Sequence, residues 1–191
     1  MTSDRFSRVI AAIDAANARD PERTGAGGEA RPAALVYGQR MSSELVRFVP
    51  DASEHLRIAA RAQHLERWKI PRRSFPEGRR GYLAWRAEAA RFHARRVAEL
   101  MAACGYPAAD CERVGRIVRK EGLRRDAEVQ ALEDVACLVF LRHYFADFAR
   151  GRDPDQVFRI VAKTARKMSP AGRAAAAKLD LPPELAPALA V

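Results

Sequence analysis

Helical periodicity is the feature that most constrains the fold of this chain. Apolar residues recur at i, i+3, i+4 and i+7 in one segment after another, beginning with Phe6, Val9, Ile10 and Ile13. Proline, glycine and charge clusters separate these segments, and no run of alternating apolar and polar residues predicts a strand. The sequence therefore predicts an all-α fold, a single-domain helical bundle of about seven to eight helices.

The bounds of the predicted helices follow from this periodicity and from the proline and glycine residues at their ends. After the first helix, the predicted helices cover residues 32–48, 52–68, 81–103, 107–121, 126–150 and 153–167. Residues 21–32 and 69–80 are predicted to be loops, since glycine, proline and charge are concentrated there. We expect one all-α domain over residues 1–169 and a peripheral tail, rich in alanine and proline, over residues 170–191.

The chain is strongly basic. Its 191 residues include 34 Lys+Arg and 24 Asp+Glu, which gives a formal net charge of +10. Excess positive charge favours anionic partners such as nucleic acid, nucleotides or phosphorylated metabolites. No apolar run is long enough for a membrane span, and three irregularly spaced cysteines argue against a disulfide framework. We therefore expect a cytoplasmic protein with no membrane partner and an anionic small-molecule substrate, with RNA as the alternative partner.

Four ionisable residues interrupt the apolar stripes of four different predicted helices: His64, His93, Glu121 and Asp134. Burying a charge without a partner is costly, so we expect the four side chains to meet in one pocket. Two imidazoles and two carboxylates on facing helices could bind a divalent metal, or could act as catalytic acid and base. The alternative is that each histidine is a hydrogen-bonded core residue and that each carboxylate caps a loop or pairs with a buried arginine.

The predicted loop over residues 69–80 contains five Lys or Arg residues and is flanked by aromatic residues. That mixture is typical of phosphate contact combined with base stacking, although a solvated basic loop is the alternative. The residues predicted to bind the substrate are Arg67, Trp68, Arg72, Arg73, Arg79, Arg80, Arg86 and Lys120. A basic stripe that ends with Arg166 and Lys167 is either a further anion-binding edge or a solvated helix face.

Several motifs together resemble one uncharacterised family. They occupy residues 60–68, 70–72, 81–86, 120–121, 130–135, 163–164 and 167–169. In this combination they resemble the domain-of-unknown-function 4202 family over nearly the whole chain, from about Phe6 to Ser169. The family name implies a fold-length domain and carries no activity.

Residues 93–138 also resemble the later half of a metal-dependent phosphohydrolase domain of the HD superfamily. The matching features are His93 at the start of a helix, the Gly105-Tyr106-Pro107 turn, and Asp134 at the start of an apolar run. This resemblance implies an HD-like helical fold and a divalent metal, which would be Mn, Fe, Zn or Mg. It also implies a hydrolase that acts on a phosphorylated small molecule or nucleotide.

The resemblance implies that His64, His93, Glu121 and Asp134 hold this metal and carry the catalysis. His64 stands for the histidine of the His-Asp pair, but Leu65 occupies the place of the aspartate. Further carboxylates would have to come from Glu121, Glu44 or Glu66. Two other functions stay open: a non-catalytic basic helical module that binds RNA or another polyanion, and a structural protein whose buried polar cluster fixes the helix register.

Overall fold

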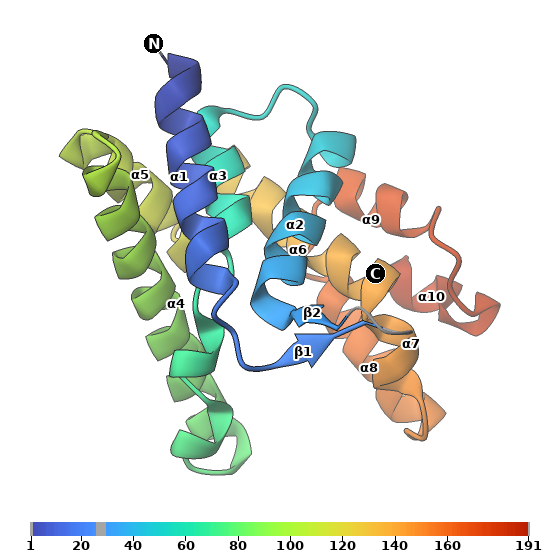
Figure 1. Ribbon diagram of the computed structural model, residues 1–191. Helices are drawn as coiled ribbons and strands as arrows, with labels where there is room; N and C mark the ends of the chain where they lie inside the picture. Colours follow the sequence, from blue (N-terminus) through green and yellow to red (C-terminus); the bar gives the residue numbers. More distant parts are fainter. Residues whose placement is uncertain (1, 26–29, 191) are drawn as a thin grey trace.

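The computed structural model describes residues 2–25 and 30–190, which form a helical bundle with one small hairpin (Figure 1). The elements in chain order are α1 (Thr2–Asn17), β1 (Arg23–Thr24), β2 (Arg31–Pro32), α2 (Ala33–Phe48), α3 (Glu54–Ala62), η1 (Arg67–Lys69), η2 (Arg72–Ser74), α4 (Gly78–Ala103), α5 (Ala108–Arg119), α6 (Ala127–His143), α7 (Phe145–Ala149), α8 (Pro154–Ala165), α9 (Pro170–Ala176), η3 (Pro183–Leu185) and α10 (Ala186–Leu189). The prediction of an all-α, single-domain bundle is confirmed. None of the described helices is long and apolar enough to cross a membrane.

The predicted loop over residues 21–32 is described only in part. Residues 26–29 lie outside the described residues. On either side of them, β1 and β2 pair as antiparallel strands, with Arg23 opposite Pro32 and Thr24 opposite Arg31. This hairpin leads directly into α2.

Helix α6 joins the two hydrophobic cores of the molecule. The larger core lies among α1 to α6, and α6 contributes Val129, Leu132, Val135 and Val139 to it. The smaller core lies among α6 to α10 and includes Leu138 of α6. In Figure 1, α4 and α5 lie on one side of α6, and α8, α9 and α10 lie on the other. The middle of α6 is buried as the sequence predicts, because both cores need its apolar faces.

The end of the chain is not peripheral in the structure. The segment after residue 169 forms α9, η3 and α10, and its buried side chains include Ala176, Leu185, Ala188 and Leu189. Alanine and glycine let these short helices approach the bundle closely. At Gly172, a Cβ atom would lie 2.7 Å from the carboxyl carbon of Asp134, so α9 packs against α6 with no room for a side chain there.

Three helices end earlier than predicted. The helix predicted over residues 52–68 ends at Ala62 and is followed by a turn and η1. The helix predicted over residues 107–121 ends at Arg119, because Lys120 adopts a left-handed backbone with φ of 59°. Tyr144 divides the helix predicted over residues 126–150 into α6 and α7. Two of these early ends determine where the candidate site residues lie.

Candidate functional site

The turn after α3 carries two residues at the centre of the site, His64 and Arg67. Glu66 lies between them with a left-handed backbone, φ 52°. The backbone N–H of Glu66 donates to Asn17 Oδ1 at 2.9 Å, and its carboxylate accepts a hydrogen bond from Arg96 Nε at 2.6 Å. Contacts with α1 and α4 therefore fix this turn, because its own backbone is not helical.

His93 of α4 supports the same turn. Its Nδ1 lies 2.6 Å from the carbonyl oxygen of Leu65, so Nδ1 carries the hydrogen and donates it. Burial lowers the pKa of His93 to about 4, which keeps its imidazole neutral at pH 7. The ring centroids of His93 and His64 are 6.1 Å apart, and His64 stacks on Tyr37 of α2 at 4.0 Å. Tyr37 reaches His64 because its neighbour Gly38 leaves no Cβ between α2 and α3.

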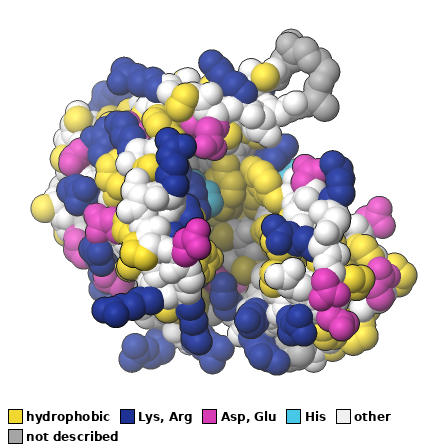
Figure 2. All heavy atoms as spheres, turned by 90° about the horizontal axis from the view of Figure 1, so that it is seen from below, with side chains coloured by type: hydrophobic (Ala, Val, Ile, Leu, Met, Phe, Trp, Pro, Cys, Tyr) yellow, Lys and Arg dark blue, Asp and Glu magenta, His cyan; other side chains and the backbone are white. Residues whose placement is uncertain are grey.

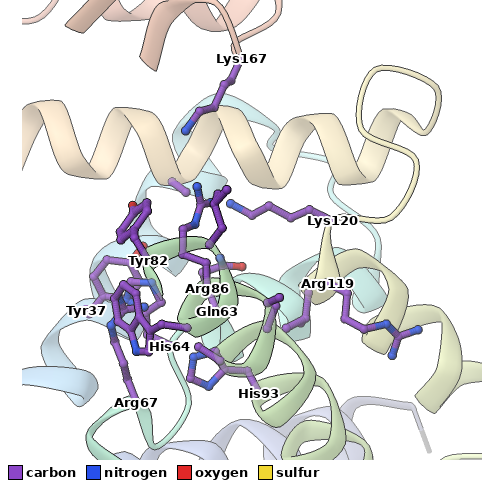
Figure 3. Close-up of a pocket in the computed structure, with 17 residues that line it drawn as sticks. Tyr37, Gln63, His64, Arg67, Tyr82, Arg86, His93, Arg119, Lys120 and Lys167 are labelled. Atoms are coloured by element: carbon purple, nitrogen blue, oxygen red, sulfur yellow. The ribbon is translucent and has the colours of Figure 1, made fainter. Parts of the chain in front are cut away.

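A cavity of about 450 Å³ opens beside the two imidazoles, and we call it the cationic cavity. Five of its lining residues are cations. Arg119 of α5 pairs with Glu112 and Glu121. The other four come from four separate segments: Arg67 of η1, Arg86 of α4, Lys120 at the end of α5 and Lys167 after α8. In Figure 3, Lys120 and Lys167 extend from different sides toward the space beside Arg86. Figure 2 shows a hollow in this face, with Lys and Arg side chains around it and histidine atoms inside it. No Asp or Glu is among the described residues that line the cationic cavity.

One buried carboxylate, Glu133 of α6, pairs with two of these cations. Lys120 Nζ donates to Glu133, and Lys167 Nζ lies 3.8 Å from its other carboxylate oxygen. Burial raises the pKa of Glu133. The charge and hydrogen bond of Lys120, together with the charges of Lys167 and Arg86, outweigh burial and hold that pKa below its usual range. Glu133 is therefore ionised at pH 7. A single carboxylate beside four cations leaves an excess of positive charge at the cavity.

Arg67 and Arg86 have no carboxylate within ion-pair distance among the described residues. The guanidinium of Arg67 lies 4.6 Å from the Trp85 ring centroid, and that of Arg86 lies 5.9 Å from the Tyr82 ring centroid. Burial lowers the pKa of Arg67. Burial, together with the charges of Arg67 and the other cavity cations, holds the pKa of His64 well below its ordinary value. The cavity thus contains positive charges that no carboxylate of the described residues neutralises, an arrangement that is costly without a counter-charge.

A second cavity, of about 510 Å³, adjoins the first, and we call it the aromatic cavity. The residues that line both cavities include Tyr37, His64, Arg67 and Trp85. The rings of Trp68 and Tyr144 line the aromatic cavity alone. The indole N–H of Trp85 donates to the carbonyl oxygen of Ile70 at 2.8 Å, which fixes the ring between the two cavities.

The structure does not bring Glu121 to this site, so the expectation that it shares the pocket is wrong. The backbone of Lys120 is left-handed, so α5 ends before Glu121. Glu121 therefore does not continue the inward-facing stripe of that helix. Glu121 is exposed, and its carboxylate accepts a hydrogen bond from Arg119 Nε at 2.6 Å. Arg119 lines the edge of the cationic cavity, but Figure 3 shows its guanidinium pointing away from the other cations.

Asp134 is buried as expected, but it joins two helices instead of lining either cavity. Its carboxylate accepts the backbone N–H of Ser169 at 2.8 Å and the Ser169 hydroxyl at 2.6 Å. Gln130 donates to the same carboxylate at 3.0 Å and to the carbonyl oxygen of Lys167 at 2.9 Å. Since Ser169 is the N-cap of α9, Asp134 has the capping role that was the alternative interpretation. Its placement in a shared pocket is wrong.

The four residues predicted as metal ligands therefore do not fit a common ion. Only His64 and His93 are neighbours. In the part of the chain that the structure describes, no group of three or more His, Cys, Asp or Glu side chains is placed to hold a metal ion. Binding of a divalent metal stays a prediction of the sequence.

The predicted substrate-binding residues are divided between the two cavities and the surface. Arg67, Arg86 and Lys120 line the cationic cavity, Arg67, Trp68, Arg72 and Arg73 line the aromatic cavity, and Arg79 and Arg80 line neither. Arg79 and Arg80 belong to the first turn of α4, which begins at Gly78 and leaves both side chains exposed. Of the predicted basic loop, therefore, Arg72 and Arg73 line a cavity, whereas Arg79 and Arg80 do not.

Six polar or aromatic residues that line the cationic cavity were not among the predicted site residues: Tyr37, Gln63, Tyr82, Trp85, Arg119 and Lys167. Gln63 is buried, and its Oε1 has no hydrogen-bond partner among the described residues. The sequence gives a signal for four of them. Gln63 precedes His64 directly, Lys167 ends the predicted basic stripe, and Tyr82 and Trp85 are among the aromatic residues around the predicted basic loop. Tyr37 gives no such signal, since aromatic residues are also common in cores.

A family model described as a domain of unknown function (DUF4202) matches residues 7–189. No curated protein and no solved structure matches the chain. The resemblance to the HD superfamily therefore stays a prediction. The matched range includes α9 and α10 as well as the segments that form both cavities. The chain belongs to the family of domains of unknown function designated DUF4202.

Proposed function

We propose that the cationic cavity binds the phosphate group of a small molecule and that the protein hydrolyses the phosphate ester. The observation that carries this proposal is the convergence of Arg67, Arg86, Lys120 and Lys167 on a cavity with no Asp or Glu among its described lining. Phosphate oxygens accept charge-assisted hydrogen bonds from arginine and lysine. The volume of about 450 Å³ lies in the range of small-molecule sites, roughly 300–1,000 Å³.

His64 is the residue of the cavity placed to act as a base, because it lines both cavities. Burial and the nearby cations hold its pKa well below the ordinary value, so its imidazole is neutral in the empty site. A bound phosphate offsets the charge of those cations and moves the pKa back toward the range that general-base catalysis needs. In the proposed reaction a water molecule attacks phosphorus while its proton passes to His64. The bond from phosphorus to the ester oxygen breaks, and the departing alcohol takes a proton from solvent. The four cations stabilise the negative charge that the phosphoryl oxygens carry in the transition state.

A phosphate-release assay on a panel of phosphorylated small molecules tests this proposal. We expect Lys167→Gln to weaken substrate and phosphate binding by about tenfold, because one charge-assisted contact is lost. His64→Gln should lower kcat by roughly 10²–10⁴-fold, the usual contribution of a general base, with a smaller change in KM. Lys163→Gln is the matched control, since Lys163 is exposed on α8 four residues before Lys167 and lies outside the cavity.

The proposal is overturned if Lys167→Gln affects phosphate binding no more than Lys163→Gln does, or if no phosphate ester is cleaved. The assay is run with and without Mn²⁺, Fe²⁺, Zn²⁺ and Mg²⁺, and bound metal is measured in the purified protein, because the sequence predicts a divalent metal. The alternative function, a module that binds RNA, has a different signature. Its affinity would fall steeply with salt and would depend on the exposed Arg79 and Arg80 outside the cavities.

A further inference from the structure

We propose that the aromatic cavity binds the base of a nucleotide whose phosphate occupies the adjoining cationic cavity. This inference rests on the proposed function, because it assumes that the cationic cavity holds a phosphate. It adds the substrate class, a 5′-nucleotide, and a second binding site formed by different residues.

The two cavities are adjacent enough for one ligand to occupy both. Tyr37, His64, Arg67 and Trp85 line both of them, so a molecule beside these residues contacts the two spaces at once. Arg67 lies over the Trp85 ring and has no carboxylate within ion-pair distance among the described residues. At that position its guanidinium can contact a phosphate on one side or stack on a base on the other.

The lining of the aromatic cavity suits a flat ring. Trp68, Trp85, Tyr37 and Tyr144 present aromatic surfaces to it, and the ring centroids of Tyr37 and Tyr144 are 6.0 Å apart. Bases stack on aromatic side chains without a requirement for a particular sequence, since every base has a π-face. A volume of about 510 Å³ is in the range of small-molecule sites.

The charges of the two cavities fix the orientation of the nucleotide. In the aromatic cavity, Asp20 and Glu22 offset most of the charge of the three lining arginines. No Asp or Glu is among the described lining of the cationic cavity, so its positive charge is the greater. The carboxylate of Asp20 accepts backbone N–H groups of Glu22 at 2.9 Å and Ala34 at 2.8 Å, so it is fixed in place. A phosphate is attracted more strongly to the cationic cavity, where no lining carboxylate opposes it, whereas an uncharged base is indifferent to this difference. The phosphate therefore belongs in the cationic cavity and the base in the aromatic one.

Equilibrium binding of AMP, UMP and ribose 5-phosphate to the full chain tests this inference. These ligands share the phosphate and the ribose, and phosphate release is followed in the same samples so that turnover is not mistaken for binding. We expect the better nucleotide to bind at least about tenfold more tightly than ribose 5-phosphate, because a stacked base contributes that much. Trp68→Leu should lower nucleotide affinity at least fivefold more than ribose 5-phosphate affinity, and Trp68→Phe should restore most of the loss.

Phe158→Leu is the matched control, because Phe158 is an exposed aromatic residue of α8 outside both cavities. Circular dichroism and the thermal midpoint show that each variant is folded. If nucleotides and ribose 5-phosphate bind equally, and Trp68→Leu changes the two alike, the inference is overturned and the phosphate site stands. If neither these ligands nor inorganic phosphate binds, the proposed function fails as well.

Discussion

The buried carboxylates among the described residues all have partners; Asp20 and Asp134 accept backbone N–H groups, and the others pair with cations. Glu44, Glu66 and Glu133 each have a cationic partner, as when Arg142 Nε donates to Glu44 at 2.9 Å. Arg67, by contrast, is half-buried at a cavity with no carboxylate within ion-pair distance of it among the described residues. An unpaired charge destabilises a fold unless a ligand supplies the counter-charge. This difference separates the paired carboxylates of the bundle from a cavity cation that has no carboxylate partner among the described residues.

Asp126 is a residue whose contribution to stability should depend on pH. It is the N-cap of α6, accepts N–H groups of Glu128 and Val129, and accepts a hydrogen bond from Arg113 Nη2 of α5 at 3.0 Å. The hydrogen bond from Arg113 is the main cause that lowers the pKa of Asp126 to about 2. Since the folded pKa lies below the ordinary value of 3.8, the stabilisation is complete above about pH 4 and is lost as the pH falls toward 2.

We therefore expect Asp126→Asn to lower the free energy of unfolding by about 2 kcal/mol at pH 7. The asparagine keeps the N-cap, so the difference reports the charge. Urea denaturation from pH 7 downward should show the two proteins converging below pH 4. Asp147→Asn, at an exposed pair with Arg150, should have no such effect. A difference that does not change with pH would contradict the assignment.

At the scale of elements, the contact between α6 and α9 positions Lys167, one of the residues that line the cationic cavity. Asp134 and Gln130 of α6 hold Ser169 and the backbone of Lys167, so the position of Lys167 depends on how closely α9 approaches. Gly172 permits that approach, because a Cβ there would lie 2.7 Å from the Asp134 carboxyl group. The packing of α9 is therefore linked to the cationic cavity.

Gly172→Ala should push α9 away from α6. We expect a loss of about 1–3 kcal/mol in the free energy of unfolding, as for other overpacked sites, and weaker phosphate binding because Lys167 moves. The control is Gly115→Ala within α5, where the nearest atom is the flexible end of Arg119 at 3.0 Å. That change should be neutral or stabilising, since alanine favours a helix interior. Equal effects of the two substitutions in urea denaturation would rule out the close approach as the cause.

At the scale of the whole molecule, the last segment completes the smaller core. Val157 and Val161 of α8 are buried together with Leu185 and Leu189. Because α6 belongs to both cores, the end of the chain is coupled to the helices that form the cavities. The short terminal helices are therefore part of the bundle instead of an appendage to it.

Leu185→Ala should lower the free energy of unfolding by about 2–5 kcal/mol, the usual cost of truncating a buried leucine. Val46→Ala, at a side chain that is 61% exposed, should change it by less than about 0.5 kcal/mol. Thermal or urea unfolding measures both. If the two substitutions cost the same, the segment after residue 169 is peripheral, as the sequence predicts.

The sequence by itself determined the fold class and most helix positions, because helical periodicity is local and the prolines and glycines that end helices are visible in the chain. It also indicated His64, His93, Arg67, Arg86 and Lys120, which do line one cavity. Tertiary structure decided the rest. Whether Glu121 turns inward depends on the left-handed backbone of Lys120, and whether Asp134 is free depends on α9, thirty-five residues away in sequence. The direction of a side chain past a helix end, and the partner of a buried carboxylate, are set by long-range packing that no local pattern encodes.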